Sequence, residues 1–127
     1  MTETTTPGSG SRRQALGAYG ERLAAEHLVA AGMVLLDRNW RCSEGELDLV
    51  LRDGSSLVMC EAKTRTSLSH GSPHEAVTDA KLGRLVRLAT RWAAVHGIRP
   101  PEIRVDLVAM LRPRTGPTLV EHVRGVC

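Results

Sequence analysis

The sequence predicts a mixed α/β domain, in the order helix, three strands, helix, and one or two further strands. Two alternating apolar segments joined by turn residues at 53–56 are typical of a β-hairpin. Two longer segments, about 12–31 and 72–96, have helical start and stop signals and each is followed by glycine. With 127 residues, 42% of them hydrophobic and 24% charged, the chain is long enough for one core and ordinary for a soluble globular protein.

Residues 1–11 consist mostly of Thr, Ser, Gly and Pro, so we expect a disordered tail before a single domain at 12–127. The first helix is expected over about 12–31, with Gly32 at its stop position. One side of this helix carries Gly17, Glu21, Ala24 and Leu28 at helical spacing. Glu21 is then either an exposed helix charge or a carboxylate that leans over the edge of the core.

Met33 to Trp40 is expected to form the first strand, and the hairpin supplies the second and third. A four-residue loop at 53–56 sets the register and pairs the charged residues as Asp48 with Glu61 and Glu46 with Lys63. Period-two alternation puts these four side chains on one face. The other face is expected to be apolar and to consist of Leu47, Leu49, Leu51, Val58, Cys60 and Ala62.

Asp48 and Glu61 are charged residues inside apolar runs, where a carboxylate is costly unless something compensates its charge. Cross-strand partners have Cβ atoms about 4.5 to 5.5 Å apart, so two carboxylates repel each other unless a proton or a metal lies between them. Oxygen ligands suit Mg²⁺ or Mn²⁺. The alternative is a solvated hairpin face with an ion pair between Glu46 and Lys63.

The second helix is expected to begin at the capping box Ser72-Pro73-His74-Glu75 and to run to about His96. Lys81 interrupts the apolar side of this helix near its start, where a long side chain can reach a ligand or solvent. That side consists of Val77, Lys81, Leu85, Leu88, Trp92 and Val95. Another side carries Arg84, Arg87 and Arg91, which form either a solvated face or a track for phosphates.

Ile103 to Met110 is expected to form the fourth strand, with Asp106 pointing away from the side of Val105 and Leu107. A short edge strand is expected over 118–123, after a turn at 114–117.

Composition excludes several other classes of protein. No apolar run approaches a membrane span and the N-terminus lacks a secretory pattern, so a cytoplasmic location is expected. Cys42, Cys60 and Cys127 indicate neither a disulfide framework nor a zinc site. The net charge is +3, but residues 81–114 hold eight Lys and Arg against two Asp and Glu, which suits a polyanion. Phosphate-binding, dinucleotide-binding and serine-hydrolase motifs are absent, so no small-molecule cofactor is expected.

Asp48 followed by Glu61-x-Lys63 on the next strand, within this order of elements, resembles the PD-(D/E)xK nucleases of the restriction-endonuclease-like fold. More narrowly, the chain resembles the bacterial YraN family from about residue 14 to 124. The residues that carry the narrower resemblance are Gly20-Glu21, Gly45 to Val50, Glu61 to Arg65, Val77-x3-Lys81 and Arg104 to Val108. Leu47 stands where the superfamily motif has its proline.

The resemblance implies a site that binds Mg²⁺ or Mn²⁺ through Asp48, Glu61 and the backbone carbonyl of Ala62, with Glu21 as a further ligand. It implies that Lys63 orients or deprotonates the attacking water and steadies charge on the phosphate. Lys81 matches a basic residue near the phosphate. Further contacts to nucleic acid are expected from Arg65 and from the arginines of the second helix.

The implied activity is metal-dependent hydrolysis of phosphodiester bonds, in DNA rather than RNA, on branched or repair intermediates. Asp106 is expected to orient Arg104 or Lys81 from behind the site. The alternative is an inactive nuclease-fold module that binds nucleic acid or a DNA-repair partner. The sequence shows no self-complementary surface, so a homodimer and a monomer both stay open.

Overall fold

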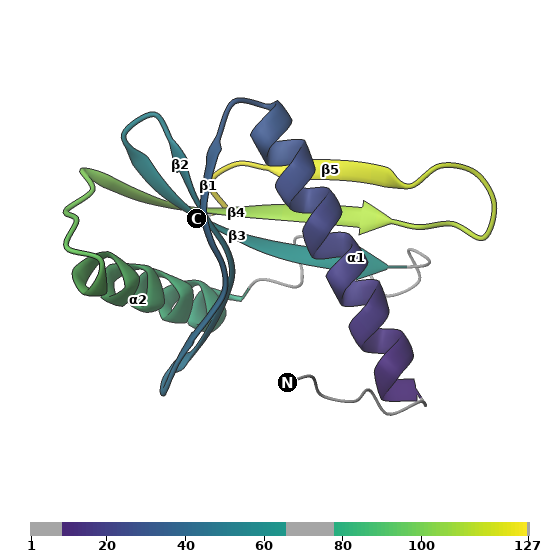
Figure 1. Cartoon of the computed structure of the whole chain (residues 1–127), viewed down its shortest axis with the longest axis horizontal. Helices are drawn as coiled ribbons and strands as arrows, with labels where there is room; N and C mark the ends of the chain where they lie inside the picture. Colours follow the sequence, from purple (N-terminus) through teal and green to yellow (C-terminus); the bar gives the residue numbers. More distant parts are fainter. Residues whose placement is uncertain (1–8, 66–77, 127) are drawn as a thin grey trace, which may run out of the picture.

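The computed structural model describes residues 9–65 and 78–126, with side chains from residue 17 onward, and shows a five-stranded sheet with two helices (Figure 1). The elements in chain order are α1 (Ser9–Ala30), β1 (Val34–Cys42), β2 (Gly45–Asp53), β3 (Ser56–Arg65), α2 (Asp79–Val95), β4 (Glu102–Leu111) and β5 (Leu119–Val123). The strands lie in sequence order across the sheet. Only the β3–β4 pair is parallel, so the predicted mixed α/β fold is confirmed.

Helix α1 begins at Ser9, three residues before the expected start, and its last turn leads into Gly32. Gly32 adopts a φ of +105°, a conformation that a residue with a side chain rarely takes. Ala24 and Leu28 of α1 are fully buried, as their helical spacing predicts. Residues 1–8 of the expected tail lie outside the described part of the chain.

The hairpin between β2 and β3 has the predicted register, but its loop is shorter than expected. Asp53 pairs with Ser56, so the turn consists of Gly54, with a φ of +63°, and Ser55. The ladder runs from this pair to Leu49 and Cys60 and ends there. The expected pairs of Asp48 with Glu61 and of Glu46 with Lys63 fall beyond the ladder, at the point where the two strands separate.

Beyond this point the end of the β1–β2 hairpin bends toward α2 (Figure 1). Leu47 packs in the cluster that contains Leu88 of α2, whereas Leu49 packs on the α1 side. The expectation that Leu47 and Leu49 share a face is therefore wrong. Strict alternation holds only while a strand keeps its pleat, and the bend at the end of the ladder changes the direction of Leu47.

Both faces of the sheet are buried, each beneath one helix. The α1 side holds Leu49, Leu51, Val58, Cys60, Val108 and Met110. The α2 side holds Leu47, Val50, Leu57, Met59 and Val105. The Asp48 and Glu61 side of the hairpin is thus largely a core surface, with the carboxylates at its open end.

Helix α2 starts later than the sequence predicted. Thr78 has extended backbone angles and caps the helix, since its hydroxyl accepts a hydrogen bond from the N–H of Lys81 at 3.2 Å. The expected capping box at 72–75 and the expected core residue Val77 lie outside the described residues. Leu85, Leu88 and Trp92 are buried as expected, but Val95 in the last turn is 64% exposed.

Asp106 is fully buried on the α1 side of β4 and is surrounded by hydrogen-bond donors. Its carboxylate accepts bonds from Arg104 at 2.9 and 3.0 Å, from the N–H of Gly125 at 2.9 Å, and contacts Nε2 of His122 at 2.8 Å. Burial alone would raise the pKa of Asp106, but these hydrogen bonds outweigh burial and lower it. The expected contact with Arg104 is present, while Lys81 lies on the other face of the sheet, so the alternative of orienting Lys81 is wrong.

None of the described helices is long and apolar enough to cross a membrane.

Candidate active site

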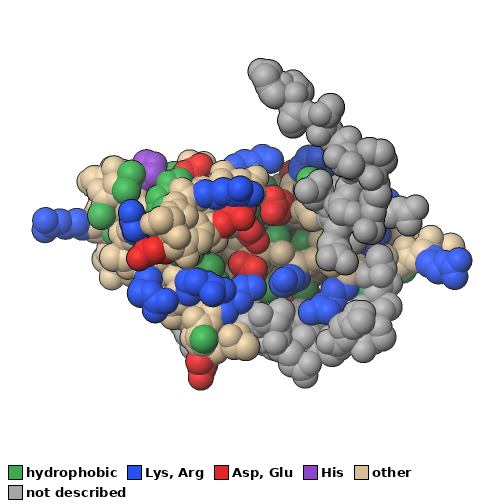
Figure 2. Space-filling model, turned by 90° about the horizontal axis from the view of Figure 1, so that it is seen from below, with side chains coloured by type: hydrophobic (Ala, Val, Ile, Leu, Met, Phe, Trp, Pro, Cys, Tyr) green, Lys and Arg blue, Asp and Glu red, His purple; other side chains and the backbone are tan. Residues whose placement is uncertain are grey.

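An open cleft of about 350 Å³ lies where β2 leaves β3 and the first turns of α2 pass below. Residues from three places line it: Glu44, Gly45 and Glu46 from the end of the β1–β2 hairpin, Asp48 and Glu61 from the separating strands, and Lys81, Arg84 and Leu85 from α2. Figure 2 shows acidic side chains gathered in a hollow on this face, with Lys and Arg side chains on either side. The arrangement can take up a cation at its centre and a polyanion along its rim.

At Asp48 a side-chain hydrogen bond takes the place of the backbone hydrogen bonds that join β2 to β3 further along the ladder. Oδ2 of Asp48 accepts from the backbone N–H of Ala62 at 3.2 Å, which anchors the carboxylate against β3 at the end of the ladder. Burial is the largest cause that raises the pKa of Asp48 to about 7, and the negative charge of Glu61 is the second. The hydrogen bond from the N–H of Ala62 lowers this pKa. The unpaired negative charge at this position is the kind that a metal ion compensates.

Glu61 and Lys81 form the most enclosed ion pair of the cleft. Nζ of Lys81 lies 2.8 Å from Oε2 of Glu61, and the two side chains are 22% and 13% exposed. The alternative of an ion pair between Glu46 and Lys63 is not found among the described residues; Glu46 instead contacts Arg41 at 3.6 Å. A lysine of α2 therefore neutralises the carboxylate that the sequence assigned to a metal.

Glu21 of α1 is half-buried and does not itself line the cleft, but the charges of Glu46 and Glu61 act on it. Burial is the largest cause that raises the pKa of Glu21, and the negative charge of Glu46 is the second. A hydrogen bond with Asn39 lowers this pKa. The charge of Glu21 also raises the pKa of Asp48, so Glu21 is part of the same electrostatic environment. The Glu21 side chain is thus neither fully exposed nor a lining residue of the cleft.

Asn39 is a residue that the sequence reasoning missed. It has a φ of +52°, in the left-handed region, and it falls between the pairs of Arg38 with Leu49 and Trp40 with Leu47. That position in the register lies across from Asp48. Asparagine tolerates the left-handed region better than most residues, which is the one signal that the sequence offered.

Lys63 is half-buried and lies two residues beyond Glu61 on β3, and it does not line the cleft. Ala62, between them, packs against the α1-side core, so alternation directs Glu61 and Lys63 to the α2 side. The structure thus brings Asp48, Glu61 and Lys81 together in the cleft, and Lys63 lies two residues further along β3, outside the lining of the cleft.

The arginines of α2 continue from the cleft along the exposed side of the helix. Arg84 lines the cleft, Arg87 is exposed, and Arg91 contacts Glu44 at 3.2 Å. The expected stripe therefore exists as a surface that leads away from the acidic centre.

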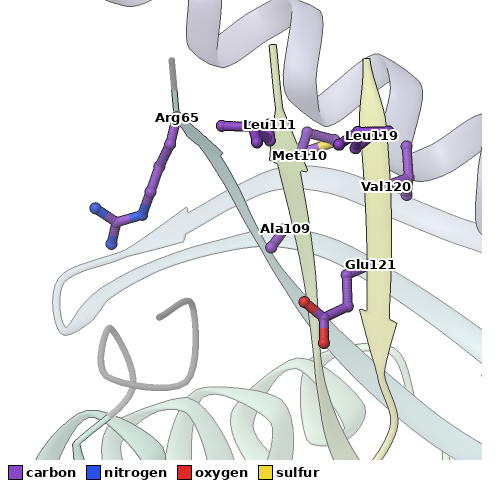
Figure 3. A pocket seen from close by; sticks show the side chains of 7 residues that line it. All are labelled: Arg65, Ala109, Met110, Leu111, Leu119, Val120 and Glu121. Atoms are coloured by element: carbon purple, nitrogen blue, oxygen red, sulfur yellow. The ribbon is translucent and has the colours of Figure 1, made fainter. Parts of the chain in front are cut away.

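Arg65 lies elsewhere, beside an apolar pocket of about 210 Å³ formed by β4 and β5 (Figure 3). Figure 3 shows that Arg65 extends away from the aliphatic side chains of Leu111 and Leu119. Its Nε is buried and has no hydrogen-bond partner among the described residues. The expected contact of Arg65 with nucleic acid would lie outside the acidic cleft.

Four carboxylates line the cleft, and among them the charge of Glu61 acts most strongly on Asp48. Among residues 9–65 and 78–126, no group of three or more His, Cys, Asp or Glu side chains is close enough to hold a metal ion. The ligand role of Glu21 therefore stays a prediction. A Mg²⁺ ion fits two carboxylates, because it keeps several waters and takes further ligands from a substrate phosphate.

The fold is a mixed α/β architecture compatible with the restriction-endonuclease-like fold, with an acidic cleft at the end of its central hairpin. The model of the uncharacterised protein family UPF0102 matches residues 20–110. The chain belongs to this family, which confirms the resemblance to the YraN proteins. It is 61% identical to a relative in Nocardioides sp. over 96% of this chain and 98% of the relative. It is 57% identical to one in Beutenbergia cavernae over 90% of this chain and 97% of the relative. Both relatives are described only as UPF0102 proteins.

Proposed function

We propose that this protein is a metal-dependent nuclease that hydrolyses phosphodiester bonds in DNA, with Asp48 and Glu61 as the metal ligands. The observation that supports this most strongly is the cleft in which these two carboxylates meet Lys81 and Arg84. Carboxylates alone would suit many cations, and arginines alone would suit many anions. Their junction in one open cleft suits a metal together with a phosphate.

The side chains have separate tasks in this proposal. Asp48 is held in place by the N–H of Ala62, so its free oxygen and Glu61 present oxygen donors at the separation of the strands. A bound Mg²⁺ would polarise the phosphate and lower the pKa of a bound water. Lys63 supplies a positive charge beside the developing negative charge of the phosphate, and Lys81 and Arg84 orient the backbone of the nucleic acid.

The proposal is tested by a panel of linear, nicked, flapped and four-way-junction DNA, incubated with Mg²⁺, Mn²⁺ or EDTA. We expect metal-dependent cleavage of at least one substrate and a loss of about a hundredfold or more in Asp48→Asn, Glu61→Gln and Lys63→Met. Glu44→Gln is the matched control, since Glu44 lines the same cleft but is 59% exposed and pairs with Arg91. Cleavage that survives Asp48→Asn, or that EDTA leaves unchanged, contradicts the proposal.

The second candidate is a module that binds nucleic acid, or a DNA-repair partner, without cutting. The ion pair of Lys81 with Glu61 favours it, because one ligand oxygen is already neutralised. This candidate predicts that duplex DNA binds with the same affinity in Mg²⁺ and in EDTA, and that Mn²⁺ gives no heat of binding in calorimetry. A binding isotherm for Mn²⁺ that disappears in Asp48→Asn contradicts this candidate.

A further inference from the structure

The cleft contains a cation of its own. Nζ of Lys81 lies 2.8 Å from Oε2 of Glu61, and Glu61 makes no other salt bridge within the described part of the chain. Asp48 has no comparable partner there and accepts only the N–H of Ala62. One ammonium group thus neutralises one of two adjacent carboxylates.

The position of Lys81 is set by its helix. Its N–H donates to the hydroxyl of Thr78 at 3.2 Å, so the backbone of Lys81 is fixed in the first turn of α2. Four flexible methylene groups separate this anchored backbone from the charge, and the side chain is 22% exposed. The charged end can therefore leave Glu61 and turn into the cleft while the helix stays in place.

A metal and Lys81 compete for the same carboxylate. Mg²⁺ and Mn²⁺ bind oxygen at about 2.0 to 2.2 Å, within the space that an ammonium group occupies at hydrogen-bond distance. A divalent ion can compensate Asp48 and Glu61 together, whereas Lys81 contacts Glu61 alone. The balance thus favours exchange of one cation for the other when the metal is available.

We propose that Lys81 is an exchangeable cation, which holds Glu61 while the metal is absent, is displaced when the metal binds, and is then free to contact the substrate phosphate. This rests on the proposed function, since it takes Asp48 and Glu61 as metal ligands. Metal binding thereby precedes and strengthens phosphate binding, because the cleft gains a free ammonium group at that moment. The Lys81 side chain alone thus sets the order in which the metal and the phosphate bind.

The test is titration of the full-length protein with Mn²⁺ by calorimetry. Lys81→Met and Lys81→Gln remove the competing charge, so we expect both to bind Mn²⁺ about five- to tenfold more tightly than wild type. Lys81→Arg keeps a cation at the position and should stay within about twofold of wild type. Arg84→Met is the matched control, because Arg84 lines the same cleft without an ion pair to Glu61.

Thermal denaturation with and without Mn²⁺ gives a second measurement for variants of low stability. The metal should raise the midpoint of Lys81→Met more than that of wild type, since only the variant leaves both carboxylates uncompensated. Equal or weaker Mn²⁺ affinity in Lys81→Met, or an equal gain in Arg84→Met, overturns the exchange.

The metal site and the exchange of Lys81 are distinguished by different outcomes. If wild type binds Mn²⁺ in a manner that depends on Asp48, but Lys81→Met binds no more tightly, the metal site stands and the exchange is wrong. If wild type and the Lys81 variants are folded and none of them binds Mn²⁺, the proposed function fails and the exchange with it.

Discussion

The backbone N–H of Ala62 donates a 3.2 Å hydrogen bond to Oδ2 of Asp48, at the place where the ladder between β2 and β3 ends. A side chain thus takes over a hydrogen bond that the neighbouring strand no longer makes. This contact joins the fold to the site, because the separation of the strands both creates the cleft and places a carboxylate inside it.

Asp48→Asn should stabilise the metal-free protein above neutral pH. The raised pKa of about 7 means that folded Asp48 keeps a proton which the unfolded chain, with the ordinary aspartate pKa of 3.8, has released. Between these values the folded state binds more protons, so the free energy of unfolding of wild type falls as pH rises. At about 1.4 kcal/mol per pKa unit the upper limit is about 4 kcal/mol, and we expect a gain of about 2 kcal/mol for the variant at pH 8.

Urea denaturation between pH 4 and pH 8 in EDTA measures this difference. Glu44→Gln, from the same cleft, should follow wild type within about 0.5 kcal/mol. Parallel pH profiles for wild type and Asp48→Asn would show that Asp48 ionises normally in the folded protein.

Asp106→Asn should destabilise the fold by about 3 kcal/mol, because it leaves Arg104 beside a buried group that no longer carries the opposite charge. Chemical denaturation at pH 7 is the measurement. Asp53→Asn serves as the control, since Asp53 also pairs with Arg104 but its side chain is 28% exposed, and its loss should cost about 1 kcal/mol or less. Equal losses in the two variants would contradict a special role for the buried carboxylate.

Gly20→Ala should destabilise the contact of α1 with the sheet by about 1 to 3 kcal/mol. A Cβ at this position would overlap Oγ1 of Thr64 and would lie 3.2 Å from Cε of Met110. The double variant with Thr64→Ala should recover most of the loss, because it removes the overlapping atom. Gly17→Ala is the matched control in the same helix, because apart from the helix's own backbone no described atom lies within 4 Å of the added Cβ, and it should gain up to about 1 kcal/mol.

Arg84→Ala and Arg87→Ala should each weaken binding to duplex DNA and reduce the slope of log K against log salt by about 1. The reason is the release of counterions from each phosphate that an arginine neutralises. Fluorescence anisotropy at several salt concentrations measures the slope. Arg99→Ala, beyond the C-terminal end of α2, is the control and should leave it unchanged; a uniform effect of all three variants would indicate general charge rather than a defined track.

The sequence predicted the order of elements and the hairpin register because both follow from local rules. Turn residues at 53–56 fixed the pairing of Val50 with Met59, and Gly32 marked the end of α1. The bend that moves Leu47 toward α2 was not predictable, because it depends on packing against a helix that lies about forty residues later in the chain.

The sequence indicated which residues gather in the candidate site better than it indicated the contacts between them. Asp48 and Glu61 were expected to face each other in a ladder, and they meet instead where the ladder ends. Residue types indicate which side chains carry opposite charges, but the pairing of Lys81 with Glu61 depends on where α2 crosses the sheet. Asn39 has its left-handed φ in the middle of β1, where the pairing with β2 is in continuous register, so no break in the strand pattern predicted it.

The parallel pairing of β3 with β4 has a consequence for how the chain assembles. Ser56 and Glu102 meet across this pair although 46 residues separate them, while β1, β2 and β3 pair through short turns. Closing the long crossover costs entropy before its contacts form, so the meander should become protected from amide exchange early and the β4 segment late. Asp48 and Glu61, the proposed metal ligands, thus lie within the early unit, while Lys81 reaches Glu61 only when folding is complete.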